Sequence, residues 1–267
     1  MKKVLFLLCV LVSICLIALG GYKLYQYWSE NAKSKEIYTG LQDFIRFPEP
    51  TRSPHASPVI GEKDAPSGVD EPPADPYTWP EVDFESLLQV NPDIVGWLYC
   101  EGTDINYPVV QGDDNAYYLT HLFDRSYNAN GCLFLDCRVA GDFSEKHSII
   151  YGHHMQSGAM FASLDGYKSQ EYFDAHPVVL LVTPERNYVV ELFAGYVAVV
   201  EDRAWEVLFD SEISYSQWLM ASREQSFFES PISPASDTRV LTLSTCSYEF
   251  SNARFVVLGR LSTIAVD

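Results

Sequence analysis

Short apolar runs, some of them alternating with polar positions, recur through the chain from residue 94 onward and predict β-strands. They are rich in β-branched and aromatic residues and are separated by Gly, Pro, Asn or Asp. Their number and spacing predict an all-β barrel or sandwich. The predicted strands cover residues 94–100, 105–110, 132–139, 147–153, 178–183, 187–200, 239–246 and 253–261.

Two segments show a helical period in place of this pattern. The first follows Asp83, a residue type suited to cap a helix, and ends before Pro92. The second covers residues 211–226 and interrupts the strands late in the chain. The predicted apolar faces are Phe84, Leu87 and Leu88 in the first helix, and Ile213, Trp218 and Leu219 in the second.

The N-terminal segment is an apolar run from Val4 to Gly21 that follows Lys2 and Lys3. At about 1.5 Å per helical residue this run nearly spans a hydrocarbon layer of about 30 Å. A cleaved signal peptide usually has a shorter apolar stretch and a small-x-small cleavage site, whereas interface-type aromatic residues follow here. Residues 1–28 are therefore predicted to be an uncleaved membrane anchor, with a signal peptide as the alternative.

The charges that flank this run predict its orientation. Lys2 and Lys3 favour a cytoplasmic N-terminus, although Lys23, Lys33 and Lys35 on the other side weaken the asymmetry. The chain is therefore expected to cross the cell membrane once and to hold its folded part outside the cell.

A proline-rich segment separates the anchor from the folded part. Residues 48–80 contain nine of the fifteen prolines and no sustained apolar period. Such a composition cannot bury enough surface to offset chain entropy. Residues 29–80 are therefore predicted to be an extracytoplasmic stalk, whose first part, residues 29–47, continues from the membrane as a short helix. The folded domain is expected to cover residues 81–267.

The formal charge of −18 is concentrated in that domain. Residues 1–80 contain eight Lys or Arg against nine Asp or Glu, and the remainder contains ten against 27. An acidic domain repels nucleic-acid phosphates and anionic lipid headgroups. Nucleic acid is therefore not expected among the partners of this protein.

The cysteines favour free thiols over a disulfide framework. Cys132 and Cys137 lie within one predicted strand, which would send them to opposite faces, so a bridge between them is unfavourable. A domain of this size also folds without covalent cross-links. Free thiols are expected at Cys100, Cys132, Cys137 and Cys246.

The stretch TLSTCSYEFSNAR, residues 242–254, ends one predicted strand with a cysteine and begins the next with an arginine. If the two strands form an antiparallel hairpin, the side chains of Cys246 and Arg254 lie close together. Cationic charge favours the reactive thiolate, and a guanidinium group hydrogen-bonds the oxyanion that forms when a thiolate adds to a carbonyl. A buried structural cysteine beside a surface arginine is the alternative that this stretch alone leaves open.

A nucleophilic cysteine needs a proton-transferring group, most often histidine. In SIIYGHHMQSGAMF a predicted strand ends at Gly152, where the backbone can turn sharply and release His153 and His154 into a loop. Neighbouring histidines in extended chain point apart, and no cluster with metal-ligand spacing occurs, so no metal is expected. The remaining histidines are expected to lie in the stalk, in solvent or in the core: His55, His121, His147 and His176.

Taken together these motifs resemble the sortase family, the cysteine transpeptidases of Gram-positive cell surfaces. The resemblance is carried by TLSTC with arginine on the next strand, and by YGH about ninety residues earlier. Residues 91–138 and the late helix are similar to class B of that family. The resemblance covers about residues 83–262. It implies an eight-stranded sortase-type β-barrel with an N-terminal helix and a late inserted helix.

The resemblance also implies roles for particular residues. Cys246 would be the nucleophile, His153 the general acid and base, and Arg254 the residue that holds the oxyanion or the substrate, with His154 as the second candidate for the histidine role. Glu249 in the connecting loop would either orient Arg254 or face water, the second being favoured. The substrate groove would be lined by Tyr151, Ser244, Asn115 and Leu119, and the segment 199–209 would shape it.

The implied reaction joins two proteins or a protein and a polymer. A sorting signal of the LPxTG or NPxTx kind on a secreted protein would be cleaved at its threonine carbonyl through a thioacyl enzyme. An amine of a peptidoglycan precursor or a pilin lysine would then resolve the thioester. No metal or organic cofactor is required, and the acidic surface permits calcium binding without indicating it.

Two other classes of function stay open. A cysteine peptidase or amidase that hydrolyses wall peptides would differ in whether an added amine captures the acyl enzyme in place of water. An anchored binding module with a vestigial site is the third, and the intact Cys246, His153 and Arg254 argue against it.

Overall fold

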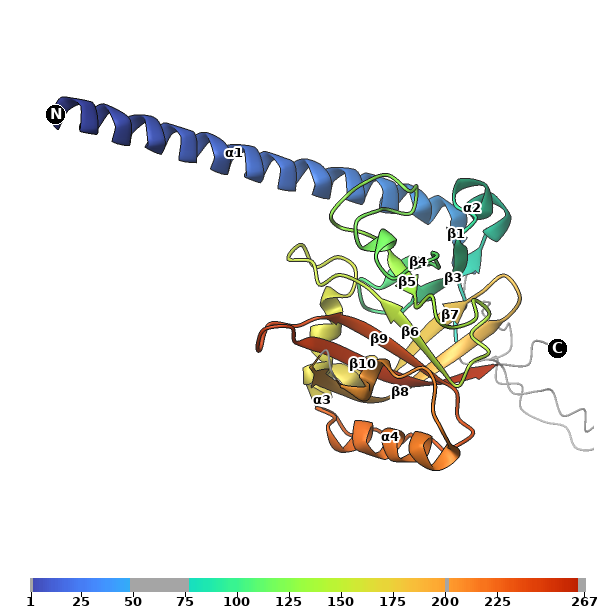
Figure 1. Cartoon of the computed structure of the whole chain (residues 1–267). Helices are drawn as coiled ribbons and strands as arrows, with labels where there is room; N and C mark the ends of the chain where they lie inside the picture. The colour runs from blue at the N-terminus through green and yellow to red at the C-terminus, as the bar shows by residue number, and fades with distance from the viewer. Residues whose placement is uncertain (1, 49–76, 200–201, 264–267) are drawn as a thin grey trace, which may run out of the picture.

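The computed structural model describes residues 2–48, 77–199 and 202–263. Within these residues eight strands close into one barrel in the order β10-β8-β7-β3-β4-β5-β6-β9 (Figure 1). Each of them coincides with a segment predicted from the sequence, so the expected β-barrel is confirmed. The strands are β3 (Ile94–Tyr99), β4 (Asn106–Val110), β5 (Leu133–Leu135), β6 (His147–Tyr151), β7 (Val178–Val182), β8 (Asn187–Ala198), β9 (Val240–Cys246) and β10 (Arg254–Thr263).

Helices and short 3₁₀ turns connect and cover the barrel, and both predicted helices are present. The Asp83 carboxylate caps the first of them by accepting a hydrogen bond from Ser86 N at 3.0 Å, and the Ser211 hydroxyl caps the second by accepting from Ser214 N at 3.1 Å. The helical elements are α1 (Lys2–Leu41), η1 (Gln42–Phe44), α2 (Phe84–Val90), η2 (Tyr117–Leu119), η3 (Ala162–Lys168), α3 (Gln170–Ala175), η4 (Arg203–Trp205) and α4 (Glu212–Glu224).

Helix α4 covers the outside of the barrel on the side away from α1 (Figure 1). Its Trp218 and Leu219 are buried, as predicted, and they join Tyr215 in a cluster with residues of β8 and β10. Ile213 is 71% exposed, so its predicted place on the apolar face is wrong. A helix that lies on a curved barrel buries only a narrow stripe, and Ile213, in the first turn, falls outside it.

The first helix after the proline-rich segment shows the same effect. Leu87 of α2 is fully buried, whereas Leu88, which was predicted to share its face, is 40% exposed. Two successive residues on a helix point about 100° apart, so a helix of two turns that contacts the barrel along one line buries only one of them.

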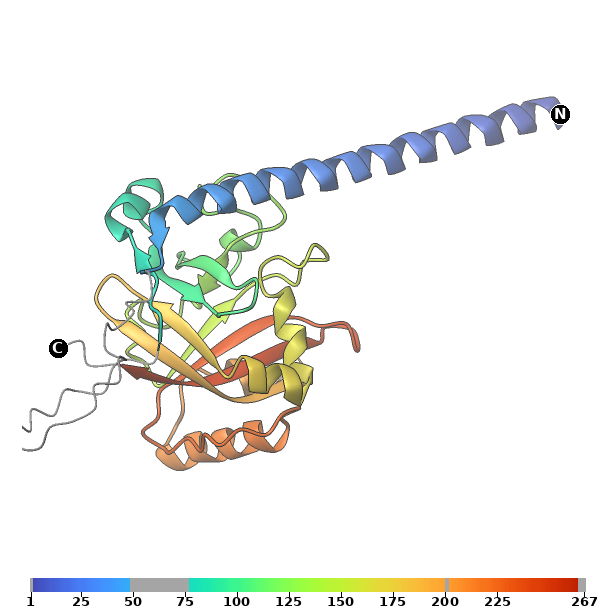
Figure 2. The same ribbon diagram turned by 180° about the vertical axis from the view of Figure 1, so that it is seen from behind.

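Helix α1 is much longer than the predicted anchor and runs without a break from Lys2 to Leu41. Figures 1 and 2 show that its N-terminal part projects away from the barrel, whereas its last turns lie against it. Among the described helices, only the one spanning Lys2–Phe44 contains an 18-residue window apolar enough to cross a membrane, and none of that window is buried. The helical continuation predicted over residues 29–47 is present as far as Leu41, after which η1 and β1 follow.

The predicted stalk is corrected in its first part, residues 29–47, because this part belongs to the folded domain. Tyr38, Leu41 and Ile45 are buried in the same apolar cluster as the barrel interior. After η1 the chain forms β1 (Ile45–Arg46), which pairs antiparallel with β2 (Glu81–Val82). The two strands that flank the proline-rich segment are therefore neighbours in one small sheet.

That pairing changes the expected role of the proline-rich segment. Residues 49–76 lie outside the described residues, but both flanking strands are fixed to the domain. The N-terminal apolar run of α1 is joined to the barrel by the last turns of α1 and not by the proline-rich segment.

The thiols agree with the sequence-based expectation. Cys100, Cys132, Cys137 and Cys246 are all free, as are the two cysteines of α1. Cys100 and Cys132 are buried in the core, where burial raises the pKa of both thiols, that of Cys132 to about 12. Neither is a nucleophile at neutral pH, because the reactive form of cysteine is the thiolate.

Candidate active site

Cys246 and Arg254 lie opposite each other where β9 ends and β10 begins. The two strands pair antiparallel with Arg254 directly across from Cys246. The loop between them is closed by a hydrogen bond from Ser247 N to Ala253 O at 3.0 Å. Directly opposed residues of an antiparallel pair present their side chains on the same face of the sheet. The hairpin expected from the sequence is therefore present, and it places the guanidinium group beside the thiol.

His153 reaches the same place through a second strand pair. Strand β6 runs parallel to β9 with Tyr151 opposite Ser244. His153 and Cys246 each follow two residues after this pair, so both leave the barrel at the same edge. Two hydrogen bonds extend the pairing past the strand end: Gly152 N donates to Ser244 O at 3.1 Å and Thr245 Oγ1 donates to Gly152 O at 2.8 Å.

Gly152, directly after β6, cannot be replaced by a larger residue without a steric clash. A Cβ atom at this position would lie 2.4 Å from Leu133 Cδ2 and 2.7 Å from Phe161 Cδ2. Both are side chains of the barrel interior and are fully buried. The glycine therefore lets the backbone pass close to the core before His153 turns outward.

The imidazole of His153 is held by a main-chain acceptor. Its Nε2 lies 2.7 Å from the carbonyl oxygen of Leu119, at the end of η2. Since a carbonyl only accepts, Nε2 carries the proton, and Nδ1 is the nitrogen that is free to exchange a proton with another group. Leu119, predicted as a groove residue, thus also contributes its carbonyl to the orientation of the histidine.

A cavity of about 390 Å³ opens between these elements. All seven residues predicted for the site line it, namely Cys246, His153, Arg254, Tyr151, Ser244, Asn115 and Leu119. Sequence reasoning missed four further lining residues: Phe134, Gly152, Trp205 and Thr245. Of these, Trp205 lies in the segment 199–209 that was expected to shape the groove, and the others lie in or next to predicted strands.

A buried carboxylate braces one wall of this cavity. Asp136 is fully buried and accepts hydrogen bonds from Arg138 Nη2 at 2.6 Å and from the Tyr151 hydroxyl at 2.8 Å. Burial opposes ionisation of this carboxyl, but the hydrogen bonds from Arg138 and Tyr151 outweigh it and lower the pKa of Asp136 to about 2. Burial and the neighbouring carboxylate raise the pKa of Tyr151, which therefore stays protonated as the donor.

The same brace reaches the remaining wall residues. Arg138 Nη2 also donates to the carbonyl of Trp205 at 3.1 Å, and Trp205 Nε1 donates to Ser244 Oγ at 3.2 Å. On the other side, Asn115 Oδ1 accepts from Cys137 N at 2.8 Å. The side chains of three predicted groove residues, Tyr151, Ser244 and Asn115, are therefore each fixed by a hydrogen bond to this part of the molecule.

Glu249 faces water, the position favoured from the sequence, and is also paired with a lysine. Its carboxylate pairs with Lys168 Nζ at 2.6 Å and accepts a hydrogen bond from Ser247 Oγ. The hydrogen bond from Lys168, reinforced by that from Ser247, lowers the pKa of Glu249 to about 2. Glu249 is exposed, as expected, although its carboxylate is paired with Lys168, and no contact links it to Arg254 in the described residues.

His154 lies on the outer side of the same loop. Its Nδ1 is 3.2 Å from the carbonyl oxygen of Cys246, and its Nε2 is 3.7 Å from Asp165, which also pairs with Lys168 at 2.8 Å. We refer to His154, Asp165, Lys168 and Glu249 as the loop clasp, because they tie the β9–β10 loop to η3. His154 does not line the catalytic cavity.

Arg254 stays available within the cavity. It is partly buried, and its Nη1 donates to the carbonyl of Ala253 at 2.9 Å. It forms no ion pair with any residue that the structure describes. A cation without a carboxylate partner keeps its donors for an oxyanion or a substrate carbonyl.

The other histidines of the folded part have structural partners. His147 is fully buried between Glu206 O and Thr242 Oγ1, each at 2.7 Å, and burial lowers its pKa to about 4. His121 and His176 bond the carbonyls of Tyr117 and Glu101. No cluster of metal-ligating side chains occurs in residues 2–48, 77–199 and 202–263.

Comparison with known proteins agrees with this fold. Residues 98–262 match the sortase domain. The chain therefore belongs to the sortase family of transpeptidases. Sortase B of Listeria monocytogenes is 35% identical over 183 residues, which is 68% of this chain and 74% of that protein. Sortase B of Staphylococcus aureus is 27% identical over 267 residues, 99% of both chains. Within the family, the chain is a sortase of class B.

Solved structures give the same result. A Staphylococcus aureus sortase B–substrate complex superposes with a TM-score of 0.65 at 32% identity and covers 68% of this chain and 85% of that chain. Sortase B from Bacillus anthracis in complex with AAEK1 gives 0.70 at 25% identity and covers 89% and 100%. The sortase-type barrel inferred from the sequence resemblance is thus confirmed.

Proposed function

We propose that this class B sortase cleaves a C-terminal sorting signal of a secreted protein and joins it to an amine of the cell wall or of a pilin. The observation that carries the proposal is the strand register, which brings Cys246 between His153 and Arg254 at the mouth of one cavity. A signal of the LPxTG or NPxTx kind would lie in this cavity with its threonine carbonyl at Cys246.

In the first half of the reaction the Cys246 thiolate adds to the threonine carbonyl carbon. The carbonyl oxygen becomes negatively charged, and the guanidinium of Arg254 stabilises it, since it is not paired with a carboxylate of the described residues. His153 in its protonated form donates a proton to the departing amine, the peptide bond breaks, and a thioester with Cys246 remains. Nδ1 is the nitrogen for this transfer, because Nε2 is bound to Leu119 O.

In the second half an amine attacks the thioester. Neutral His153 accepts a proton from this amine, the C–S bond breaks, and the Cys246 thiolate leaves as the new amide forms. The initial charge states of Cys246 and His153 are restored, so no cofactor is consumed. Water in place of the amine would give hydrolysis through the same steps.

The apolar part of α1 supports a location at the membrane. It is long enough to cross a bilayer and is unburied, and Lys2 and Lys3 precede it. We propose that residues 1–28 cross the membrane once with the barrel on the outer side. Substrates that emerge from secretion and wall precursors would then meet at the cavity.

The test uses the full-length chain in detergent micelles, a panel of fluorogenic sorting-signal peptides, and each peptide with and without a primary amine. Wild-type protein is expected to form an amine-dependent product with at least one signal, and Cys246→Ala is expected to form none. Cys137→Ser is the matched control, because Cys137 is another partly exposed thiol near the cavity and has no role in the proposed chemistry.

Each result has a defined meaning. Ligation in wild type and in Cys137→Ser, with none in Cys246→Ala, supports the transpeptidase. Cleavage that is indifferent to the amine would replace it with a cysteine peptidase or amidase. Absence of a thioacyl adduct with every peptide, judged by intact-protein mass, would contradict both.

A further inference from the structure

The last three turns of α1 make three hydrogen bonds to one short segment of the barrel, residues 128–131. Asn128 Nδ2 donates to the carbonyl of Glu30 at 2.9 Å, and Asn130 Nδ2 donates to Asn31 Oδ1 at 2.8 Å. The Tyr38 hydroxyl donates to the carbonyl of Gly131 at 2.7 Å. These contacts are buried or partly buried, and the Tyr38 side chain is 7% exposed.

The far side of that segment faces the catalytic histidine. Gly131 has a φ of +60°, and a Cβ atom added there would lie 3.1 Å from His153 Cδ2 and 2.9 Å from the carbonyl oxygen of Leu119. This oxygen is the acceptor that holds His153 Nε2 at 2.7 Å. Gly131 therefore bonds Tyr38 through its carbonyl and lies so close to the imidazole and to its acceptor that there is no room for a side chain.

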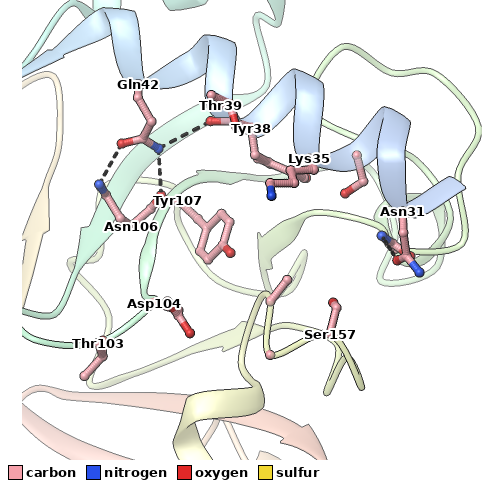
Figure 3. A pocket seen from close by; sticks show the side chains of 14 residues that line it. Asn31, Lys35, Tyr38, Thr39, Gln42, Thr103, Asp104, Asn106, Tyr107 and Ser157 are labelled. Carbon is pink, nitrogen blue, oxygen red and sulfur yellow. Dashed lines mark hydrogen bonds between the residues drawn. The ribbon is translucent and has the colours of Figure 1, made fainter. Parts of the chain in front are cut away.

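A second set of hydrogen bonds, between Gln42 and Asn106, also joins the end of α1 to the barrel and involves no residue of the active site. Gln42, directly after α1, bonds Asn106 through both ends of its carboxamide, with Asn106 Nδ2 donating to Gln42 Oε1 at 2.7 Å. Figure 3 shows this pair, with α1 forming one wall of a cavity of about 620 Å³ and residues 103–107 opposite. Neither Gln42 nor Asn106 forms a hydrogen bond with His153 or Leu119 in the part of the chain that the structure describes. The two sets allow the stability of the interface to be separated from its effect on His153.

We propose that Tyr38 is a positioning residue for catalysis. Through Gly131 it makes α1, the helix that carries the apolar N-terminal run, one of the elements that hold His153 in place. The inference rests on the proposed function, because it takes His153 as the proton-transferring group. The hydroxyl of Tyr38 fixes the Gly131 carbonyl, the peptide at Gly131 limits the position of the imidazole, and Leu119 O fixes its tautomer. Movement of α1 relative to the barrel would thus displace the His153 imidazole more than it displaces Cys246.

The experiment compares Tyr38→Phe with Gln42→Ala in the full-length chain in detergent micelles. Phenylalanine keeps the ring, which packs edge-on against Tyr107 at 5.3 Å, and removes only the hydroxyl. We expect Tyr38→Phe to lower kcat for the sorting-signal peptide by about three- to thirtyfold with KM unchanged within about twofold, since displacing a catalytic group by a fraction of an ångström costs this much. Gln42→Ala is expected to lower the melting temperature and to leave kcat within about twofold of wild type.

Two further readouts separate positioning from loss of structure. Alkylation of Cys246 by iodoacetamide needs no proton donor for a leaving amine, so its rate should be the same in wild type and Tyr38→Phe. The NMR signals of the His153 ring, assigned with His153→Gln, should shift in Tyr38→Phe and not in Gln42→Ala. The signals report on position even where turnover is absent.

Equal kcat in Tyr38→Phe and wild type, together with unchanged His153 signals, would overturn the inference. So would an equal loss of kcat in both variants, since that would make Tyr38 a contributor to stability alone. If wild type forms no amine-dependent product, the proposed function fails, and the His153 signals still decide whether Tyr38 positions the ring.

Discussion

The Arg254 side chain is tied neither to a carboxylate nor to the group around Asp136 among the described residues. Its position is set by the pairing of β10 with β9, which leaves the guanidinium group beside Cys246. Arg254→Lys keeps the charge but replaces a planar fork of donors with one ammonium group.

We expect Arg254→Lys to lower kcat/KM for a sorting-signal peptide by about a hundredfold, the size seen when one oxyanion donor is removed. The fluorogenic assay with saturating amine measures it. Arg223→Lys on the outer surface of α4 is the matched control, since its guanidinium donates to Ser233 Oγ and lies away from the cavity. Activity of Arg254→Lys within about twofold of wild type would show that charge is sufficient at this position.

Asp136 is a buried anion whose hydrogen bonds hold Tyr151 and Arg138 in two walls of the cavity, and a second prediction concerns its ionisation. Its pKa is lowered from 3.8 to about 2, so the folded state binds this proton less tightly than the unfolded chain. The resulting stabilisation, about 2 kcal/mol, is present above pH about 4 and is lost as the pH falls to about 2. The melting temperature of wild type is therefore expected to fall more steeply over this range than that of Asp136→Asn.

Asp136→Asn should also act on substrate binding at neutral pH. The asparagine oxygen can still accept from Tyr151, but it no longer holds the Arg138 guanidinium that donates to Trp205 O. We expect KM for the peptide to rise more than kcat falls. Parallel pH profiles of the two melting temperatures, with an unchanged KM, would contradict this account.

At the scale of elements, the β9–β10 loop is held by the loop clasp and not by a contact with Arg254. Lys168 bridges Asp165 of η3 and Glu249 of the loop at 2.8 and 2.6 Å, and His154 bonds the carbonyl of Cys246. Both partners of the Lys168–Glu249 pair are partly exposed, at 28% and 38%, so water weakens the pair.

Lys168→Met is expected to loosen this loop and to lower kcat/KM by about two- to fivefold, with a loss of stability of at most about 1 kcal/mol. The kinetics of the double exchange Lys168→Glu with Glu249→Lys measure whether the pair itself matters. Recovery of at least half of the lost activity is the expected result. If the exchange is as impaired as the single variant, the effect of Lys168 lies in its contacts with Asp165 or with the Phe255 ring, 5.2 Å away.

At the scale of the whole molecule, the last turns of α1 and the barrel form one folded unit. The two strands that flank the proline-rich segment are paired within it, Ile45 with Val82 and Arg46 with Glu81. Removing residues 1–80 would expose the apolar surface covered by Tyr38, Leu41 and Ile45. Each buried side chain of this kind contributes about 1.5–3 kcal/mol, and three together are comparable with the net stability of a domain.

Two deletions test this architecture by thermal unfolding. A chain that begins at Glu81 is expected to melt well below the full-length chain. A chain in which a short Gly/Ser linker replaces residues 49–76 is expected to keep the wild-type melting temperature and activity, since shortening a closed loop changes its entropy little. The opposite pattern, a stable barrel from Glu81 and a damaged linker variant, would restore the proline-rich segment as part of the fold.

The strands, the two capped helices, the free thiols and the long apolar N-terminus were predicted from the sequence because each depends on local features. Periods of two and 3.6, a capping Asp83 and a charge-free run act within a few residues of one another. The hairpin that joins Cys246 to Arg254 belongs to this group as well, since its strands are consecutive. The exposed Ile213 and Leu88 were mispredicted because a local period does not say how wide the contact with a barrel is.

What the tertiary structure alone decided are pairings between distant parts of the chain. The parallel register of β6 and β9 brings His153 beside Cys246, and no local signal fixes a register across about ninety residues. The pairing of β1 with β2 and the hydrogen bond from the Tyr38 hydroxyl to the carbonyl of Gly131 attach the end of α1 to the barrel. By itself the sequence determined the eight barrel strands, the two capped helices and the candidate residues for the chemistry. The closure of the barrel decided which of them meet, because such contacts depend on the path of the whole chain.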